Sequence, residues 1–198
     1  MIRSSRSVGE LATPAAIAAL AEPGAAAPRM PPEQTRTAVR DLLRHGGYKP
    51  SGRSKPASEY LAAASEKHSF PRINALVDAC NVASLHSGLP VSLVDLDRLD
   101  TSAGLAIRIA PPGTAYVFNP SGQTIDASGL VCLCDAQGPA GTPVKDAQRT
   151  KTHHGTLAAL AIVWGTNALP GWTVQATRWY RDLVAEIADI RLEDVAFA

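Results

Sequence analysis

The spacing of apolar residues changes near Gly88, and this change constrains the fold more than any other feature of the sequence. Before that glycine, apolar residues recur at helical intervals, which predicts helices at residues 33–45, 57–67 and 74–87. After it come short apolar runs separated by Gly, Pro and Asp, which are typical of strands and lie at residues 91–95, 105–110, 115–118, 130–135 and 157–164. The last run is rich in alanine and would also suit a helix, and helical spacing returns from Trp172. The sequence therefore predicts an α+β fold, with helices at both ends and a mixed or antiparallel sheet between them.

A chain of 198 residues, 45% hydrophobic and 19% charged, is long enough for one well-buried core. We expect an Ala/Pro-rich leader at residues 1–32, a basic helical appendage at 33–72, and the main domain with a terminal helix at 73–198. No apolar run approaches the roughly 18 residues of a membrane span, so we expect a cytoplasmic protein with no membrane partner. The three cysteines fit a reducing compartment. They lack the spacing of a zinc site, so neither a metal nor a cofactor is expected.

Charge is distributed unevenly along a chain whose net charge is only +1. Residues 29–72 carry nine Lys/Arg against four Asp/Glu, whereas residues 73–136 carry two against six. A locally cationic surface can bind a phosphate backbone even when the whole protein is nearly neutral. The alternative is that these residues form ordinary solvated charge.

Residues 74–164 carry an ordered series of motifs. The run 78–85 is followed by Gly88-Leu89-Pro90 and by Asp95-Leu96-Asp97, and further matches lie at residues 107–110, 113, 122, 129–131, 135 and 138–139. This series resembles the B3/B4 domain, the editing module of bacterial phenylalanyl-tRNA synthetase β subunits. Residues 46–61 and 143–150 resemble the freestanding members of that family, and the sequence contains no synthetase catalytic domain.

The resemblance implies a B3/B4-like β core and a function in translation quality control. The expected activity is metal-independent hydrolysis, in trans, of the ester of a mischarged tRNA, so the expected partner is the aminoacylated 3′ end of tRNA. Positioning of water and of oxyanion donors can supply much of the rate for such an activated ester. Two alternatives remain: a non-catalytic tRNA- or RNA-binding module, and a small-molecule amino-acid binder. The sequence does not indicate an oligomeric state.

Four residues are candidates for the chemistry of ester hydrolysis. Asp146 could pair with the α-ammonium of the amino acid, Arg149 could hold the terminal phosphate, and Thr150 could orient water or ribose. Asn81 could present its amide to the substrate. The alternatives are an Asp146–Arg149 ion pair that shapes the loop, and an Asn81 side chain that fixes the fold. We expect Asn81 and residues 145–150 to converge on one cleft.

Four further residues are candidates for substrate binding. Lys145 could also hold the terminal phosphate. Ser92 stands where the family has its editing histidine, and Ile162 falls near the carboxylate that reads a tyrosine hydroxyl. Because an apolar side chain cannot hydrogen-bond a phenol, tyrosine is not the expected substrate. His154, the fourth candidate, or its neighbour His153 in its place, could replace the missing imidazole, although a solvated loop pair is the alternative.

A basic segment that precedes residue 73 is the candidate surface for the tRNA acceptor stem. Its cations could neutralise phosphates, and its tyrosine could stack on an unpaired base. The alternative is that the arginines pair with Asp41 and Glu59. The candidate RNA-binding residues are Arg36, Arg40, Arg44, Tyr48, Lys49, Arg53 and Lys55.

Overall fold

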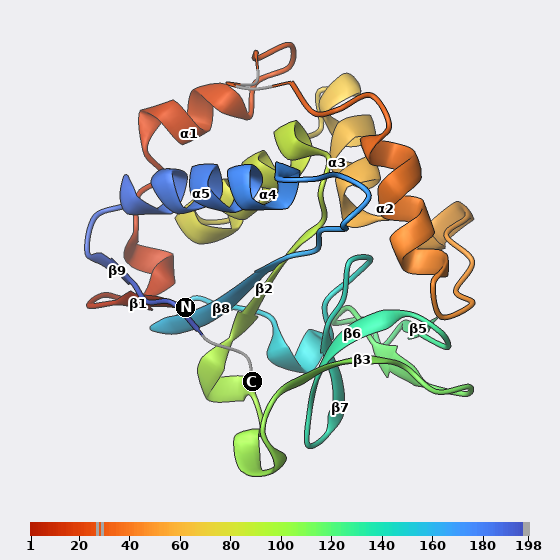
Figure 1. Ribbon diagram of the computed structural model, residues 1–198. Coiled ribbons are helices and arrows are strands. Elements are labelled where there is room, and N and C mark those ends of the chain that lie inside the picture. Colours follow the sequence, from red (N-terminus) through yellow and green to blue (C-terminus); the bar gives the residue numbers. More distant parts are fainter. Residues whose placement is uncertain (27, 29, 196–198) are drawn as a thin grey trace.

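The computed structural model describes residues 1–26, 28 and 30–195, and it combines helices with antiparallel sheets (Figure 1). Sheet A has the strand order β2-β8-β1-β9, sheet B the order β3-β6-β7, and β4 and β5 form a hairpin. Every strand pairing in the described part of the chain is antiparallel, which confirms the α+β fold class. The strands are β1 (Ile2–Ser4), β2 (Val91–Asp95), β3 (Ala106–Ile109), β4 (Ala115–Val117), β5 (Thr124–Asp126), β6 (Val131–Asp135), β7 (Gly138–Gly141), β8 (Ala158–Val163) and β9 (Ile190–Leu192).

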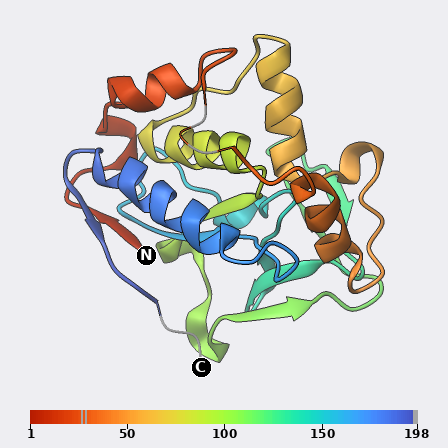
Figure 2. The same cartoon turned by 45° about the horizontal axis from the view of Figure 1, so that its top comes forward.

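Three helices cover sheet A on one side: α1 (Ala15–Leu20), α4 (Ala75–Ser87) and α5 (Trp172–Ala185). Figures 1 and 2 show α4 and α5 side by side above β2 and β8. The sequence sets both ends of α4. Asn74 caps its start by accepting a hydrogen bond from the backbone of Val77 at 3.0 Å, and Gly88 ends it with a φ of 71°.

The remaining helices lie beside the sheets and carry the basic segment. They are α2 (Thr35–Arg44) and α3 (Ala57–Glu66), each within two residues of its predicted bounds. Val39 and Leu43 of α2 pack into a second core cluster with Leu130 and Ile125 of the hairpin region. Single 3₁₀ turns lie at η1 (Val8–Glu10), η2 (Gly52–Ser54), η3 (Leu96–Arg98), η4 (Thr101–Ala103) and η5 (Gln148–Thr150).

Part of the predicted leader at residues 1–32 belongs to the folded core. Its first residues form β1, which lies between β8 and β9 inside sheet A. Val8 and Ile17 are fully buried in the same core cluster as α4 and α5. Residues 27 and 29 lie outside the described residues. Because the N-terminal segment supplies an inner strand and core side chains, the boundary at residue 32 does not separate a linker from a domain.

The alanine-rich run after Gly155 forms a strand rather than a helix. As β8, it pairs with β2 over five residues on one side and with β1 on the other. Alanine has a higher helix propensity than strand propensity, but pairing on both edges and burial between core clusters override that local preference.

Two backbone contacts bring the basic loop after α2 against the hairpin region. A Cβ atom on Gly46 would lie 2.4 Å from the carbonyl oxygen of Gly129, so only glycine permits this approach. The backbone N–H of Ala57 donates to the carbonyl of Pro143 at 2.9 Å. Residues 48–56 are therefore held between the hairpin and the turn at residues 142–146.

In the described part of the chain, no helix is both long enough and apolar enough to cross a bilayer.

Candidate functional site

A groove of about 460 Å³ lies where the turn η2, the β4–β5 hairpin and the turn at residues 142–146 meet. Residues of the turn η2 and of the β4–β5 hairpin line it together with Lys145. Its lining is mainly polar and combines two cations, one carboxylate, amides and hydroxyls with an aromatic ring. The lining residues are Arg53, Ser54, Phe118, Gly122, Gln123, Thr124, Ile125, Asp126 and Lys145.

The cations of this groove lack carboxylate partners. Neither Arg53 nor Lys145 forms a salt bridge with any other residue that the structure describes. Burial lowers the pKa of Lys145, and the nearby positive charges of Arg53 and Lys151 lower it further. Like charges that repel one another at a partly enclosed site favour an anionic ligand, because an anion relieves the repulsion.

Aromatic rings hold the lysine in place at the end of the groove. The Lys145 ammonium lies 3.9 Å from the ring centroid of Phe118 and 5.9 Å from that of Tyr60. The neighbouring Lys151 donates to the carbonyl of Phe118 at 2.6 Å. Tyr116 of β4 donates to the carbonyl of Lys145. The hairpin thus fixes the backbone and side chain of Lys145 without neutralising its charge.

Asp146 follows Lys145 but is engaged with the sheet. Its two carboxylate oxygens accept backbone hydrogen bonds from Thr142 at 3.0 Å and from Leu93 of β2 at 3.2 Å. Burial raises the pKa of Asp146 to about 6, although the backbone hydrogen bonds from Thr142 and Leu93 oppose the rise. A carboxylate that titrates near neutrality can act as a general base, but here it also braces the turn that presents Lys145.

The raised pKa of Asp146 predicts a specific pH dependence of stability. A carboxyl group whose pKa is higher in the folded protein than its ordinary 3.8 binds its proton more tightly when folded, so its contribution to stability falls as pH rises from about 4 to about 6. We expect the stability advantage of the wild type over Asp146→Asn to shrink by about 3 kcal/mol across that interval. Urea unfolding of both proteins at several pH values measures it, and a difference that stays constant from about pH 4 to pH 7 would contradict the assignment.

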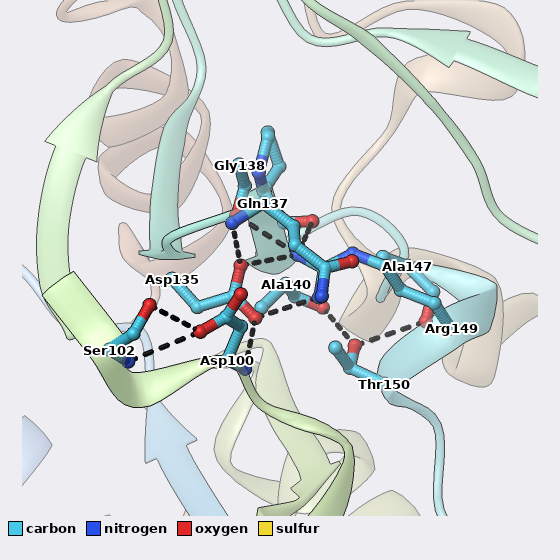
Figure 3. A network of polar contacts seen from close by, with 10 residues as sticks. Asp100, Ser102, Asp135, Gln137, Gly138, Ala140, Ala147, Arg149 and Thr150 are labelled. Carbon is cyan, nitrogen blue, oxygen red and sulfur yellow. Dashed lines mark hydrogen bonds and ion pairs between the residues drawn. The ribbon is translucent and has the colours of Figure 1, made fainter. Parts of the chain in front are cut away.

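Arg149 has a different partner from the expected one. Its guanidinium forms two hydrogen bonds of 2.7 Å with Asp135 of β6 and also donates to the carbonyls of Gly138 and Pro139 (Figure 3). The Asp135 side chain is fully buried and also accepts backbone hydrogen bonds from Asp100 and Gln137. The alternative of an Asp146–Arg149 pair is therefore wrong. Arg149 instead ties the 3₁₀ turn η5 to the β6–β7 turn and does not line the groove.

Thr150 and Asn81, the other two catalytic candidates, do not converge with Asp146 as expected. Thr150 is fully buried, and its hydroxyl lies 2.6 Å from the carbonyl of Ala140 and 3.1 Å from that of Ala147 (Figure 3). This hydroxyl is committed to the backbone and cannot orient a substrate water. Asn81 lies half-buried on α4, and its side chain has no hydrogen bond to residues 142–150. Among the described residues, Arg149 and Thr150 are therefore engaged in internal hydrogen bonds, and no hydrogen bond joins Asn81 to them.

Ser92 and Ile162 are neighbours, but their side chains serve the packing and hydrogen bonding of the fold. They lie directly opposite each other in the pairing of β2 with β8. Ser92 is 1% exposed, and its hydroxyl donates to the carbonyl of Thr142 and accepts from the indole of Trp164 at 2.8 Å. Ile162 packs against the core cluster that contains Trp164. Ser92 therefore offers no free group to a substrate.

The two histidines lie apart from the groove. The ring of His154 lies over Gly9, where an added Cβ would come within 2.2 Å of it. His153 directs Nε2 toward the buried Asp95 at 3.4 Å and accepts the N–H of Gly155 at Nδ1. Both line a separate hollow with residues of the N-terminal segment, so His154 does not replace the histidine missing at Ser92.

The arginines of α2 are largely compensated by acidic residues. Arg40 forms a bidentate pair with Glu59 at 2.6 and 2.8 Å, and Arg36 lies 3.3 Å from the same carboxylate. Arg44 pairs with Asp41 at 2.7 Å. The alternative pairing with Asp41 and Glu59 is therefore observed. The positive charge that these carboxylates do not neutralise lies in the loop that follows α2.

The loop itself divides into buried and exposed residues. Tyr48 is 6% exposed and belongs to the second core cluster, so it cannot stack on a base. Lys49 is exposed, Lys55 is half-buried, and Arg53 lines the groove. The loop therefore contributes cations to this face of the molecule but no free aromatic ring.

Sequence reasoning missed the part of the site that the hairpin supplies. In the sequence, Tyr116 and Phe118 are only parts of an apolar run, and no motif distinguishes Lys151. The one available signal was the density of cations at residues 145–151, which does not reveal a groove without the tertiary approach of the hairpin. Among residues 1–26, 28 and 30–195, no three or more His, Cys, Asp or Glu side chains form a group that could hold a metal ion.

No known protein-family model matches the chain, and no curated protein matches it either.

Proposed function

We propose that the protein binds the 3′ end of an RNA in the groove between η2 and the β4–β5 hairpin, with aminoacylated tRNA as the partner. The observation that carries the proposal is the set of cations without carboxylate partners: Arg53 and Lys145 line the groove, and Lys151 lies beside them. Closely spaced cations at a polar groove suit successive phosphates. The resemblance to the B3/B4 domain, which rests on sequence motifs alone, directs the choice of RNA toward tRNA.

Hydrolysis of the aminoacyl ester is a second candidate function. It is favoured by Asp146, a carboxylate one residue from Lys145 whose pKa is raised to about 6 by burial. Its two backbone hydrogen bonds leave further lone pairs that could accept a proton from water. The commitment of Arg149, Thr150 and Ser92 to internal hydrogen bonds leaves this activity less well supported than binding.

One experiment addresses both candidates: titration of the protein with a panel of aminoacylated tRNAs, following binding and loss of the ester together. We expect saturable binding whose log-log salt dependence has a slope of about −2 to −3, because about three cations release counterions. Tight binding with ester loss at the buffer rate supports the RNA-binding module alone. Ester loss that accelerates as pH rises through about 6 supports hydrolysis by Asp146. If no tRNA in the panel binds in a salt-dependent way, the proposal is contradicted.

A further inference from the structure

A cavity of about 260 Å³ lies where α5 meets the last turn of α4, two helices that lie side by side in Figure 2. None of the residues that line this cavity lines the groove between η2 and the β4–β5 hairpin. Pockets for drug-sized ligands begin at about 300 Å³, so the cavity suits a smaller molecule.

Two tryptophans of α5 give the cavity an aromatic lining. Trp172 and Trp179 are seven positions apart, so they lie on the same side of the helix and about 10.5 Å apart along its axis. Ala176 lies between them, and its methyl group is too small to fill the space between two indole rings. A planar aromatic ring is the group that such a recess favours, because it packs against the indole surface.

Contacts with α4 fix both tryptophans in the absence of a ligand. The indole Nε1–H of Trp172 donates to the carbonyl of Ser87 at 3.0 Å. The ring of Trp179 packs edge-on against His86, with 6.0 Å between the ring centroids. His86 is held in turn by a hydrogen bond of 2.7 Å between its Nε2 and the carbonyl of Leu20. Because these rings are already ordered, a ligand binds between them at a small cost in conformational entropy.

Two opposite charges also line the cavity. Arg178 and Asp182 are four positions apart on α5, so they are neighbours on the surface of the helix. Neither forms a salt bridge, with the other or with any further residue in the part of the chain that the structure describes. A guanidinium group pairs best with a carboxylate, and a carboxylate pairs well with an ammonium group. A ligand that carries both charges therefore complements this pair.

We propose that the cavity binds a free aromatic α-amino acid. The ring packs against Trp172 and Trp179, the carboxylate binds Arg178, and the α-ammonium group binds Asp182. The paired charges distinguish an amino acid from an aromatic acid, an aromatic amine or a nucleoside, each of which lacks at least one of the two. This inference does not depend on RNA binding, because the cavity and the groove share no lining residue.

The test is isothermal titration calorimetry of the full-length protein with phenylalanine and three matched ligands. Phenylalaninamide lacks the carboxylate, N-acetylphenylalanine lacks the ammonium group, and adenosine is aromatic but uncharged. We expect phenylalanine to bind with a dissociation constant below about 1 mM, and each of the other three to bind about tenfold more weakly. Equal affinity for all four ligands, or no binding of phenylalanine at roughly ten times that concentration, overturns the proposal.

Two exposed substitutions assign each charge to its group on the ligand. Arg178→Gln should abolish the preference for phenylalanine over phenylalaninamide, and Asp182→Asn should abolish the preference over N-acetylphenylalanine. Glu186→Gln changes an exposed acidic residue at the end of α5 that does not line the cavity, and it should keep both preferences. If Arg178→Gln or Asp182→Asn weakens every ligand by the same factor, that residue does not bind the group assigned to it and the proposed binding mode is wrong.

Discussion

Replacing Arg53 and Lys145 together with glutamine is expected to weaken tRNA binding about 10- to 100-fold and to reduce the slope of the salt dependence by about 2. Both side chains line the groove, and neither has a carboxylate partner among the described residues, so a phosphate is the ligand that their positive charge favours. Neither change removes a salt bridge, and we expect the folded state to survive. Binding is measured by titration of one aminoacylated tRNA at several salt concentrations.

The control for this experiment is Arg36→Gln with Arg44→Gln. This pair removes the same formal charge from exposed positions on α2, where the arginines already contact Glu59 and Asp41. We expect binding to weaken less than about threefold, because charges already paired contribute little to the local field. If both double variants lose affinity equally, binding depends on overall charge and the groove is not the site.

Arg149→Ala is expected to lower the free energy of unfolding by about 3 kcal/mol. The change leaves the fully buried Asp135 carboxylate without its bidentate partner, and it frees the carbonyls of Gly138 and Pro139. The Arg149 side chain is 30% exposed, so the loss should fall at the lower end of the range for a broken buried pair. Urea unfolding at pH 7 measures the effect.

Two further variants separate the structural role of Arg149 from a role in binding. Arg178→Ala removes an exposed arginine from α5 and should change stability by less than about 0.5 kcal/mol. Arg149→Lys keeps the charge but loses the bidentate geometry, so it should be intermediate in stability. A stable Arg149→Ala protein that nevertheless loses tRNA binding would contradict the assignment of Arg149 to the fold and support its predicted phosphate contact.

Local pattern was sufficient for most of the helices and for the longer strands. The amphipathic spacing, Asn74 and Gly88 predict α4 to within one residue, and the apolar run at 91–95 coincides with β2. The sequence pattern does not predict the strands β1, β5, β7 and β9. They are three or four residues long, too short to show a period, and they become strands only because a partner strand lies beside them.

The sequence predicted only part of the candidate site, because the partners of its polar residues come from distant segments. The sequence identified Arg53 and Lys145, since clustered cations are visible in a linear chain. It allows Asp41 and Glu59 as partners of the α2 arginines, but it does not show that these pairs form or that Asp135 neutralises Arg149. Asp135 and Glu59 lie 14 and 19 positions from the arginines that they neutralise.

The sequence by itself determined where helix gives way to strand, the α+β class and the position of the basic segment, because these depend on residues that are neighbours along the chain. Only the tertiary structure decided that Tyr48 and Thr150 are buried, that Arg40 and Arg149 are neutralised, and that Arg53 meets Lys145 across a groove. Burial and charge pairing depend on distances between segments remote in sequence. The side chains left with unpaired charge are known only after every other pair has formed.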